Sequence, residues 1–461
     1  MLFSSLVFLF FFLPVVLAGY YLIPRRFRNA FLLLADLVFY GFGEPAFVLL
    51  MLFSIVINYA GGLLISRSRE SARRFALAGT LAVNLLLLGI FKYAGFLSDT
   101  LRLLPPLSGI PVIEIPLPIG ISFYTFQSMS YLVDVYREDC APQRNILTFG
   151  AYISLFPQLI AGPIVRYRDV ERELADPHRE SIEAFSLGAE LFLVGLSKKV
   201  LLANPLGALW NRLSASPEAL GIMGAWVGAV AFSLQLYFDF SGYSDMACGL
   251  GRMFGFTFCQ NFNYPYTARS VSDFWRRWHM SLTGWFRDYV YIPLGGSRCP
   301  VPRALLNIAI VWMLTGLWHG ASWNFVLWGL YYAVLLVLEK RFFGKLLQRF
   351  PSIVGRVYTL LLAVVGWMLF ALEDAGRLKQ YLCAMFTPGF SSGSVTATVI
   401  AYVPLLTVAV LACLPVIKQR FLALPERVKR PLAAVLSVFA LLLCTAALVS
   451  DSYNPFLYFR F

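Results

Sequence analysis

Long apolar segments without a single charged side chain limit the folds that this sequence can adopt. The extreme case is residues 304–338, because none of these 35 residues is Asp, Glu, Lys or Arg. A helix of that length would measure about 53 Å, whereas the hydrocarbon core of a bilayer is about 30 Å thick. The segment therefore predicts a pair of membrane helices, and the short cluster His319-Gly320-Ala321-Ser322 is the natural break between them.

The composition supports a membrane protein. Only 14% of the residues are charged and 59% are hydrophobic, whereas soluble domains have about 25% charged and 45–50% apolar residues. This balance excludes a soluble enzyme, a nucleic-acid-binding protein and a disordered scaffold. The net charge of +13 comes from short basic clusters between apolar runs, which is typical of cytoplasmic loops. We predict an all-α polytopic protein with about ten to twelve transmembrane helices, forming one domain over residues 1–461.

Two apolar segments are unsuited to a simple membrane crossing. Residues 145–165 contain Pro157 and Gly162-Pro163, and proline removes a backbone donor. Interrupted backbone is tolerated at membrane depth only inside the protein or beside a cavity, so we expect a re-entrant segment here. The second segment, residues 184–209, contains Lys198-Lys199, and we expect its helix to end early or to open onto a polar cavity.

Residues 252–303 are strongly basic, with seven Arg against two Asp, and we expect them on the cytoplasmic side. Within this region, residues 271–289 place aromatic and aliphatic side chains at helical spacing, with Arg276, Arg277 and Arg287 off that stripe. The pattern predicts one amphipathic helix at the membrane interface. Its simpler role is an aromatic anchor. The alternative is a basic platform for an anionic donor, because Arg binds phosphate well.

The three histidines lie in different contexts. His178 is in a charged loop, where a functional role is not expected, and His279 is in the basic region. His319 lies in an apolar run, where a polar side chain either marks a functional cavity or is a core residue that bonds a carbonyl. The seven Cys lie far apart without metal-ligand spacing, and no G-x-S-x-G, H-E-x-x-H or P-loop motif occurs. A buried His without an evident nucleophile suits general-base activation of a hydroxyl.

Eight stretches together carry a resemblance to a known family. The chain resembles the membrane-bound O-acyltransferases and, within them, the bacterial branch that acetylates alginate. The likeness covers nearly the whole chain, and the eight stretches in this order are highly specific. They are 116–127, 156–166, 239–245, 261–266, 273–279, 291–296, 316–320 and 454–459.

This resemblance implies a fold, a site and substrates. The fold is a ring of transmembrane helices around a thin centre, in a multi-pass protein of the bacterial inner membrane. His319 takes the place of the family's membrane-embedded histidine, and His279 that of its second polar residue. The resemblance supplies acetyl-CoA as donor substrate, with no bound cofactor. It also implies periplasmic O-acetyltransferase or adaptor partners and a polysaccharide acceptor, in a setting of membrane lipids and without nucleic acid.

A mechanism follows as a hypothesis. The thioester enters near the basic region, and His319 removes a proton from the acceptor hydroxyl as its oxygen attacks the thioester carbonyl. His279 orients the reacting groups or relays the proton. The oxyanion needs donors, for which Trp318, Trp323, Asn324 and backbone amides are candidates. For binding the donor we single out Arg276, Arg277, Trp278, Trp318 and Asn324.

Three alternatives stay open. The protein could transfer D-alanine to teichoic acid from a carrier protein, although the motifs favour the acetyl branch. It could also be a transporter with its histidine in a translocation path, although no internal repeat is found. Finally, it could be a scaffold whose chemistry is done by a periplasmic partner.

Overall fold

The computed structural model describes residues 1–160, 162–176, 180–450, 456 and 457. Within these residues the regular structure is helical, without strands, and this confirms the all-α prediction. The chain forms two compact units, one of Met1–Phe192 with Ser244–Cys259 and one of Leu193–Tyr243 with Gln260–Phe461. His178 lies outside the described residues, as do Ala161 and residues 454, 455, 458 and 459 of the resembling stretches.

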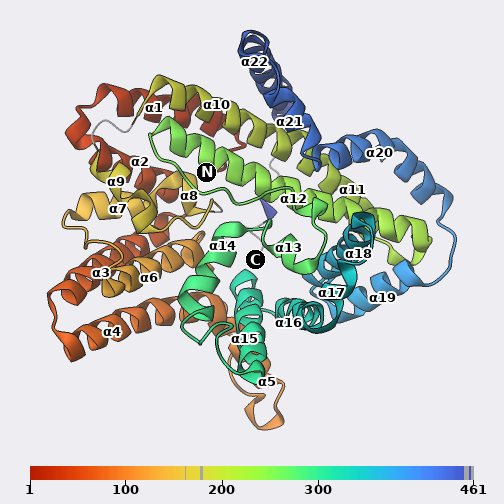
Figure 1. The fold of residues 1–461 in the computed structure, drawn as a ribbon, viewed down its shortest axis with the longest axis horizontal. Coiled ribbons are helices and arrows are strands. Elements are labelled where there is room, and N and C mark those ends of the chain that lie inside the picture. Colours follow the sequence, from red (N-terminus) through yellow and green to blue (C-terminus); the bar gives the residue numbers. More distant parts are fainter. Residues whose placement is uncertain (161, 177–179, 451–455, 458–461) are drawn as a thin grey trace. The chain divides into compact units, whose positions relative to one another are not determined.

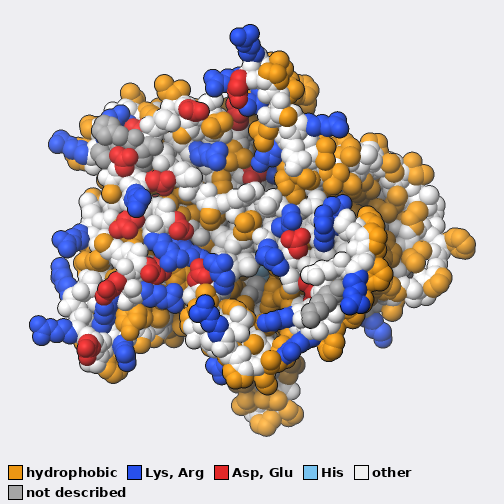
Figure 2. Space-filling view, in the orientation of Figure 1, with side chains coloured by type: hydrophobic (Ala, Val, Ile, Leu, Met, Phe, Trp, Pro, Cys, Tyr) orange, Lys and Arg blue, Asp and Glu red, His pale blue; other side chains and the backbone are white. Residues whose placement is uncertain are grey.

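Seven helical segments among the described residues are long and apolar enough to cross a membrane. They are Pro45–Arg67, Glu70–Arg102, Gly221–Met253, Val301–His319, Ser352–Ala371, Gly393–Ala412 and Glu426–Ser450. This is fewer than the ten to twelve predicted from the apolar runs. A shorter apolar helix, Phe8–Leu22, is also present, whereas α2 (Arg28–Gly43) and α16 (Trp323–Leu338) are not among these segments. Figure 2 shows apolar side chains gathered over α20 (Gly393–Ala412), as expected for a surface that faces lipid.

The first unit contains nine complete helices among its described residues (Figure 1). They are α1 (Leu13–Leu22), α2, α3 (Val48–Arg67), α4 (Glu70–Leu88), α5 (Ala94–Arg102), α6 (Ile121–Arg137), α7 (Ile146–Ser154), α8 (Phe156–Leu159) and α9 (Tyr167–Ala175). Two further helices, α10 (Ile182–Ser197) and α12 (Gly221–Met253), contribute residues to both units.

The interrupted segment at 145–165 is broken where proline predicts. α7 ends at Ser154, and α8 begins at Phe156. Asp36 of α2 supplies the partner that the break removes: its Oδ1 accepts the backbone N–H of Phe156 at 2.8 Å, and its Oδ2 accepts the Ser154 hydroxyl at 3.3 Å. All three residues are fully buried. The interrupted backbone therefore lies inside the protein, as backbone without a helical partner must, and its depth in the membrane stays a prediction.

The second unit holds the remaining helices of the described chain (Figure 1). They are α11 (Asn204–Ser214), α13 (Val271–Trp275), α14 (Met280–Phe286), α15 (Val301–His319), α16, α17 (Gly344–Leu347), α18 (Ser352–Ala371), α19 (Ala375–Phe386), α20, α21 (Val416–Leu422) and α22 (Glu426–Ser450). π-helical turns at Lys198–Ala203, Arg287–Tyr291 and Glu339–Phe343 extend α10, α14 and α16.

The uncharged segment 304–338 forms the predicted helix pair. α15 ends at His319 and α16 begins at Trp323. The two helices are in backbone contact through glycines, because a Cβ on Gly316 would collide with the Phe325 carbonyl and one on Gly329 with the Trp312 carbonyl. Small residues allow this close approach in membrane proteins. This packing sets the distance between α15, which ends at His319, and α16, which follows it.

Lys199 lies within a helix that does not end early, so that part of the prediction is wrong. The chain continues from α10 through the π-helical turn into α11. Lys199 is buried and forms an ion pair with Asp239 of α12, whose second oxygen accepts the backbone N–H of Leu457 at 2.8 Å. A buried charge needs such a partner, and here the partner is another side chain of the protein.

The single amphipathic helix predicted for 271–289 is also wrong. The chain forms two short helices, α13 and α14, because His279 between them has a left-handed backbone with φ +44°. A right-handed helix does not continue through that conformation. Phe274, Trp278 and Trp285 are buried in the protein. The aromatic stripe is therefore part of the core and does not anchor the chain at an interface.

The glycine contact in the α15–α16 pair gives a testable prediction. We expect Gly316→Ala to destabilise the protein by about 1–3 kcal/mol, because the added methyl group has no space at the Phe325 carbonyl. Thermal unfolding of the purified protein in detergent measures this. The matched control is Gly79→Ala in α4, where nothing lies within 4 Å, and it should be neutral or stabilising. Equal stability of the two variants would contradict the packing described.

Candidate active site

A cavity of about 890 Å³ in the second unit contains both histidines of interest. Helices α13, α14 and α15 line it, together with the segment from the end of α16 to the start of α18. His279 and His319 are among the lining residues, and their ring centroids are 6.4 Å apart. Both are buried, with 1% and 5% of their surface exposed. The structure thus brings together two residues that the sequence singled out separately.

His319 is held by aromatic rings at the end of α15. Its ring centroid lies 5.0 Å from that of Trp318, 5.1 Å from that of Trp328 on α16 and 5.4 Å from that of Phe370 on α18. Gly320 follows it, because a Cβ there would overlap the Phe325 ring. The imidazole is therefore fixed by large side chains from three helices.

His279 is held by a polar contact and by aromatic rings. Its Nδ1 lies 3.2 Å from Oδ1 of Asn261, and the Phe240 ring packs against it in a T-shaped arrangement with centroids 4.7 Å apart. Burial lowers the pKa of His279 to about 3, because removal from water disfavours the charged imidazolium. The side chain is therefore a neutral imidazole at neutral pH.

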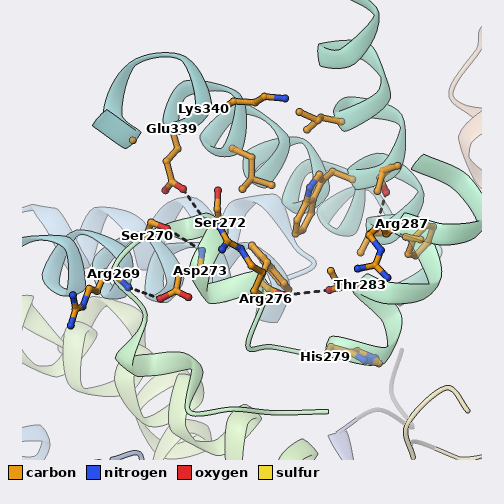
Figure 3. A pocket seen from close by; sticks show the side chains of 18 of the residues that line it. Arg269, Ser270, Ser272, Asp273, Arg276, His279, Thr283, Arg287, Glu339 and Lys340 are labelled. Carbon is orange, nitrogen blue, oxygen red and sulfur yellow. Dashed lines mark hydrogen bonds between the residues drawn. The ribbon is translucent and has the colours of Figure 1, made fainter. Parts of the chain in front are cut away.

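The exposed part of the cavity is basic. Arg269, Arg276, Arg287 and Lys340 line it and are exposed, whereas the histidines are buried. In Figure 3, Lys340 and His279 lie at opposite ends of the lining. Among the residues that the structure describes, Arg276 and Lys340 have no carboxylate partner. A basic opening that leads to two buried histidines suits an anionic substrate whose reacting end reaches the interior.

The two carboxylates of the lining are engaged in local structure. Oδ1 of Asp273 accepts a hydrogen bond from Nε of Arg277 at 2.9 Å. Glu339, at the end of α16, accepts the backbone N–H groups of Val271 at 2.7 Å and Ser272 at 3.0 Å. These N–H groups begin α13 and have no partner within the helix. Glu339 therefore attaches α13 to α16 and fixes the place from which Arg276 reaches the cavity.

The other predicted donor-binding residues occupy different positions. Trp318 touches both histidine rings, with centroids 5.7 Å from His279 and 5.0 Å from His319. Trp278 packs in the core against Trp367, with centroids 4.7 Å apart, and it is not part of the cavity lining, nor is Arg277. The Asn324 amide donates to the Phe370 carbonyl at 3.2 Å. This residue therefore links the start of α16 to the end of α18.

Four residues of the site received no role from the sequence. Asn261 belongs to a resembling stretch, but nothing in its spacing connects it to His279. Arg269 was only part of a basic run. Glu339 and Lys340 lie some 20 residues after His319 in a segment that the sequence suggests is a loop, whereas the structure has them in the π-helical turn that extends α16. A buried acid at the end of an apolar helix, such as Glu339, is a signal that sequence inspection could have used.

Comparison with known proteins places the chain in a family. Residues 121–372 match MBOAT, the membrane-bound O-acyltransferase family. A protein named probable alginate O-acetylase AlgI from Azotobacter vinelandii is 43% identical over 84% of this chain and 79% of its own length. The chain belongs to the membrane-bound O-acyltransferase family. It is therefore a multi-pass membrane enzyme that transfers acyl groups to hydroxyl oxygens.

Two further relatives carry other names. A peptidoglycan O-acetyltransferase from Helicobacter pylori is 33% identical, over 84% of this chain and 80% of its own length. A teichoic acid D-alanyltransferase from Bacillus subtilis is 29% identical, over 77% of this chain and 90% of its own length. The names of both relatives describe the transfer of an acyl group.

The attachment of α13 by Glu339 is testable. We expect Glu339→Gln to lower the free energy of unfolding by about 1–3 kcal/mol, because the amide replaces one acceptor oxygen with a donor that faces a backbone N–H. Thermal unfolding measures the loss. Glu373→Gln is the control, because Glu373 is exposed and should change stability by no more than about 0.5 kcal/mol. An unchanged melting temperature in Glu339→Gln would contradict the role of its carboxylate.

Proposed function

We propose that this acyltransferase moves acetyl groups from cytoplasmic acetyl-CoA across the bacterial inner membrane to hydroxyl groups of an alginate-like exopolysaccharide, together with periplasmic partner proteins. The observation that carries the proposal is the pair of buried histidines, 6.4 Å apart, in a cavity with a basic opening. The names of the more similar relatives describe acetyl transfer to polysaccharides, at 43% and 33% identity, against 29% for the relative named for D-alanyl transfer.

The basic opening suits the donor. Coenzyme A carries phosphate groups at one end and the thioester at the other, so phosphates at Arg276 and Lys340 would direct the acetyl group toward the histidines. Arginine is well matched to phosphate because its planar guanidinium donates two parallel hydrogen bonds. The cavity volume of about 890 Å³ is in the range of sites for large ligands.

In the proposed reaction, His319 takes the proton of the acceptor hydroxyl while that oxygen attacks the thioester carbonyl. The C–S bond then breaks, and the CoA sulfur leaves with the proton that His319 held. An acetyl ester and free CoA thiol result, so atoms and protons balance. The Trp318 indole N–H, beside both imidazole rings, is our candidate for stabilising the oxyanion. His279 orients the reacting groups or relays the proton.

The two histidines provide the first functional test. In inverted inner-membrane vesicles from the source bacterium, acetyl-CoA labelled in its acetyl group should label the polymer with wild-type protein. His319→Ala and His279→Ala should lower the rate by about 10²–10⁴-fold, because each removes a group that handles the proton. Detergent gel filtration checks that the variants fold. Wild-type turnover in His319→Ala would overturn its role as base, and labelling only from a D-alanyl carrier would overturn the acetyl assignment.

Two neighbouring arginines test the donor site. Arg276 lines the cavity, whereas Arg277 pairs with Asp273 outside the lining. We expect Arg276→Gln to raise KM for acetyl-CoA by about 10-fold, because the variant loses one charge-assisted hydrogen bond to the donor. Arg277→Gln should keep KM within about twofold. Initial rates over a range of acetyl-CoA concentrations measure both, and equal effects in the two variants would refute the placement of the phosphates at Arg276.

A further inference from the structure

Asn261 makes a compact set of hydrogen bonds with the three residues from His279 to Ser281. Its backbone carbonyl accepts the N–H of Met280 at 3.0 Å. Its side-chain Oδ1 accepts the backbone N–H of Ser281 at 3.2 Å and the Ser281 hydroxyl at 2.9 Å. The same Oδ1 lies 3.2 Å from Nδ1 of His279. One buried amide therefore supports the whole turn that carries the histidine.

These contacts determine the protonation of the imidazole. A backbone N–H only donates, so the Asn261 atom that faces Ser281 must be the oxygen and not the amide nitrogen. Oxygen at that position only accepts, and therefore Nδ1 of His279 must carry the hydrogen. In a neutral imidazole one nitrogen is protonated and the other has the lone pair. The lone pair is then on Nε2.

The left-handed backbone at His279 also depends on the hydrogen bonds to Asn261. Its φ of +44° lies in the left-handed region, which is uncommon for residues other than glycine and persists only where the surroundings impose it. The N–H groups of Met280 and Ser281 that follow this turn both donate to Asn261. Asn261 therefore stabilises the conformation that places the imidazole in the cavity as well as its tautomer.

The choice of an amide at this position also needs an explanation. The Asn261 Nδ2 is buried and has no hydrogen-bond partner among the residues that the structure describes. Buried donors without partners are rare and call for a reason. A carboxylate would leave no such donor, but its negative charge beside the ring would favour the imidazolium. The amide supplies an acceptor oxygen and keeps His279 neutral.

We propose that Asn261 is a positioning residue for acyl transfer: its side-chain oxygen holds His279 as the Nδ1–H tautomer, so that Nε2 is the nitrogen that exchanges a proton or accepts a hydrogen bond during the reaction. This role rests on the proposed acetyl transfer at the same site. It gives a role in the reaction to Asn261, although none of residues 261–266 lines the cavity.

The tautomer can be observed directly. The chain has three histidines, so ¹⁵N-histidine labelling of the full-length protein in nanodiscs gives few side-chain signals, and His178→Gln and His319→Gln assign them. In the wild type we expect Nδ1 of His279 protonated and Nε2 unprotonated. In Asn261→Ala the Nδ1–H state should lose its preference. Asn261→Asp keeps the acceptor oxygen, so Nδ1 should stay protonated. A wild-type signal from Nε2–H overturns the proposal, as does loss of Nδ1–H in Asn261→Asp.

Kinetics distinguish positioning from folding. Asn261→Ala should lower kcat by about 10-fold to 100-fold, the range typical of losing a partner that orients a functional histidine, while KM for acetyl-CoA changes by no more than about twofold. The control is Asn307→Ala, because Asn307 is also a buried Asn and donates to the carbonyls of Leu294 and Gly296. It should lose stability but keep the His279 tautomer and kcat.

An unchanged kcat in folded Asn261→Ala would overturn the positioning role. The two proposals also fail separately, because the NMR signal does not require turnover. Wild-type protein with the expected tautomer but no acetyl transfer would contradict the proposed function alone.

Discussion

The backbone contact between α15 and α16 is the constraint on which the site depends. Between membrane helices, lipid supplies no hydrophobic driving force, so association rests on close packing. Gly316 and Gly329 provide it by allowing each helix to touch a carbonyl of the other. This contact fixes how the two helices pack near the point where α15 ends, at His319. Trp328 and Phe370 surround the imidazole from neighbouring helices, so its position follows from the packing.

A second principle is that several polar groups removed from water have a partner that shapes the fold. Asp36 supplies acceptors where α7 and α8 separate. Glu339 accepts the first N–H groups of α13. Asn261 does the same for the turn at His279. Because an unpaired polar group in such a setting is costly, these few contacts position short helices that could not be stable by themselves.

The sequence predicted some of these features and missed others for a physical reason. The helix pair and its break after His319 were predictable from local properties. These are the length of the uncharged segment, which exceeds the bilayer thickness, and the cluster of helix-interrupting residues within it. The single helix over 271–289 was a wrong prediction, since helical spacing of aromatic residues does not reveal a left-handed residue at His279. That conformation depends on hydrogen bonds to Asn261, 18 residues earlier, which no local pattern contains.

Composition and motif order by themselves determined the membrane setting, the all-α class and the family, because each depends on residue content along the chain and not on where side chains meet. His279 and His319 could also be singled out in this way. Only the tertiary structure decided that the two lie 6.4 Å apart, that Arg276 lines their cavity while Arg277 does not, and that Asn261 sets the tautomer of His279. These relations join residues from separate elements, and the packing of helices fixes them in space.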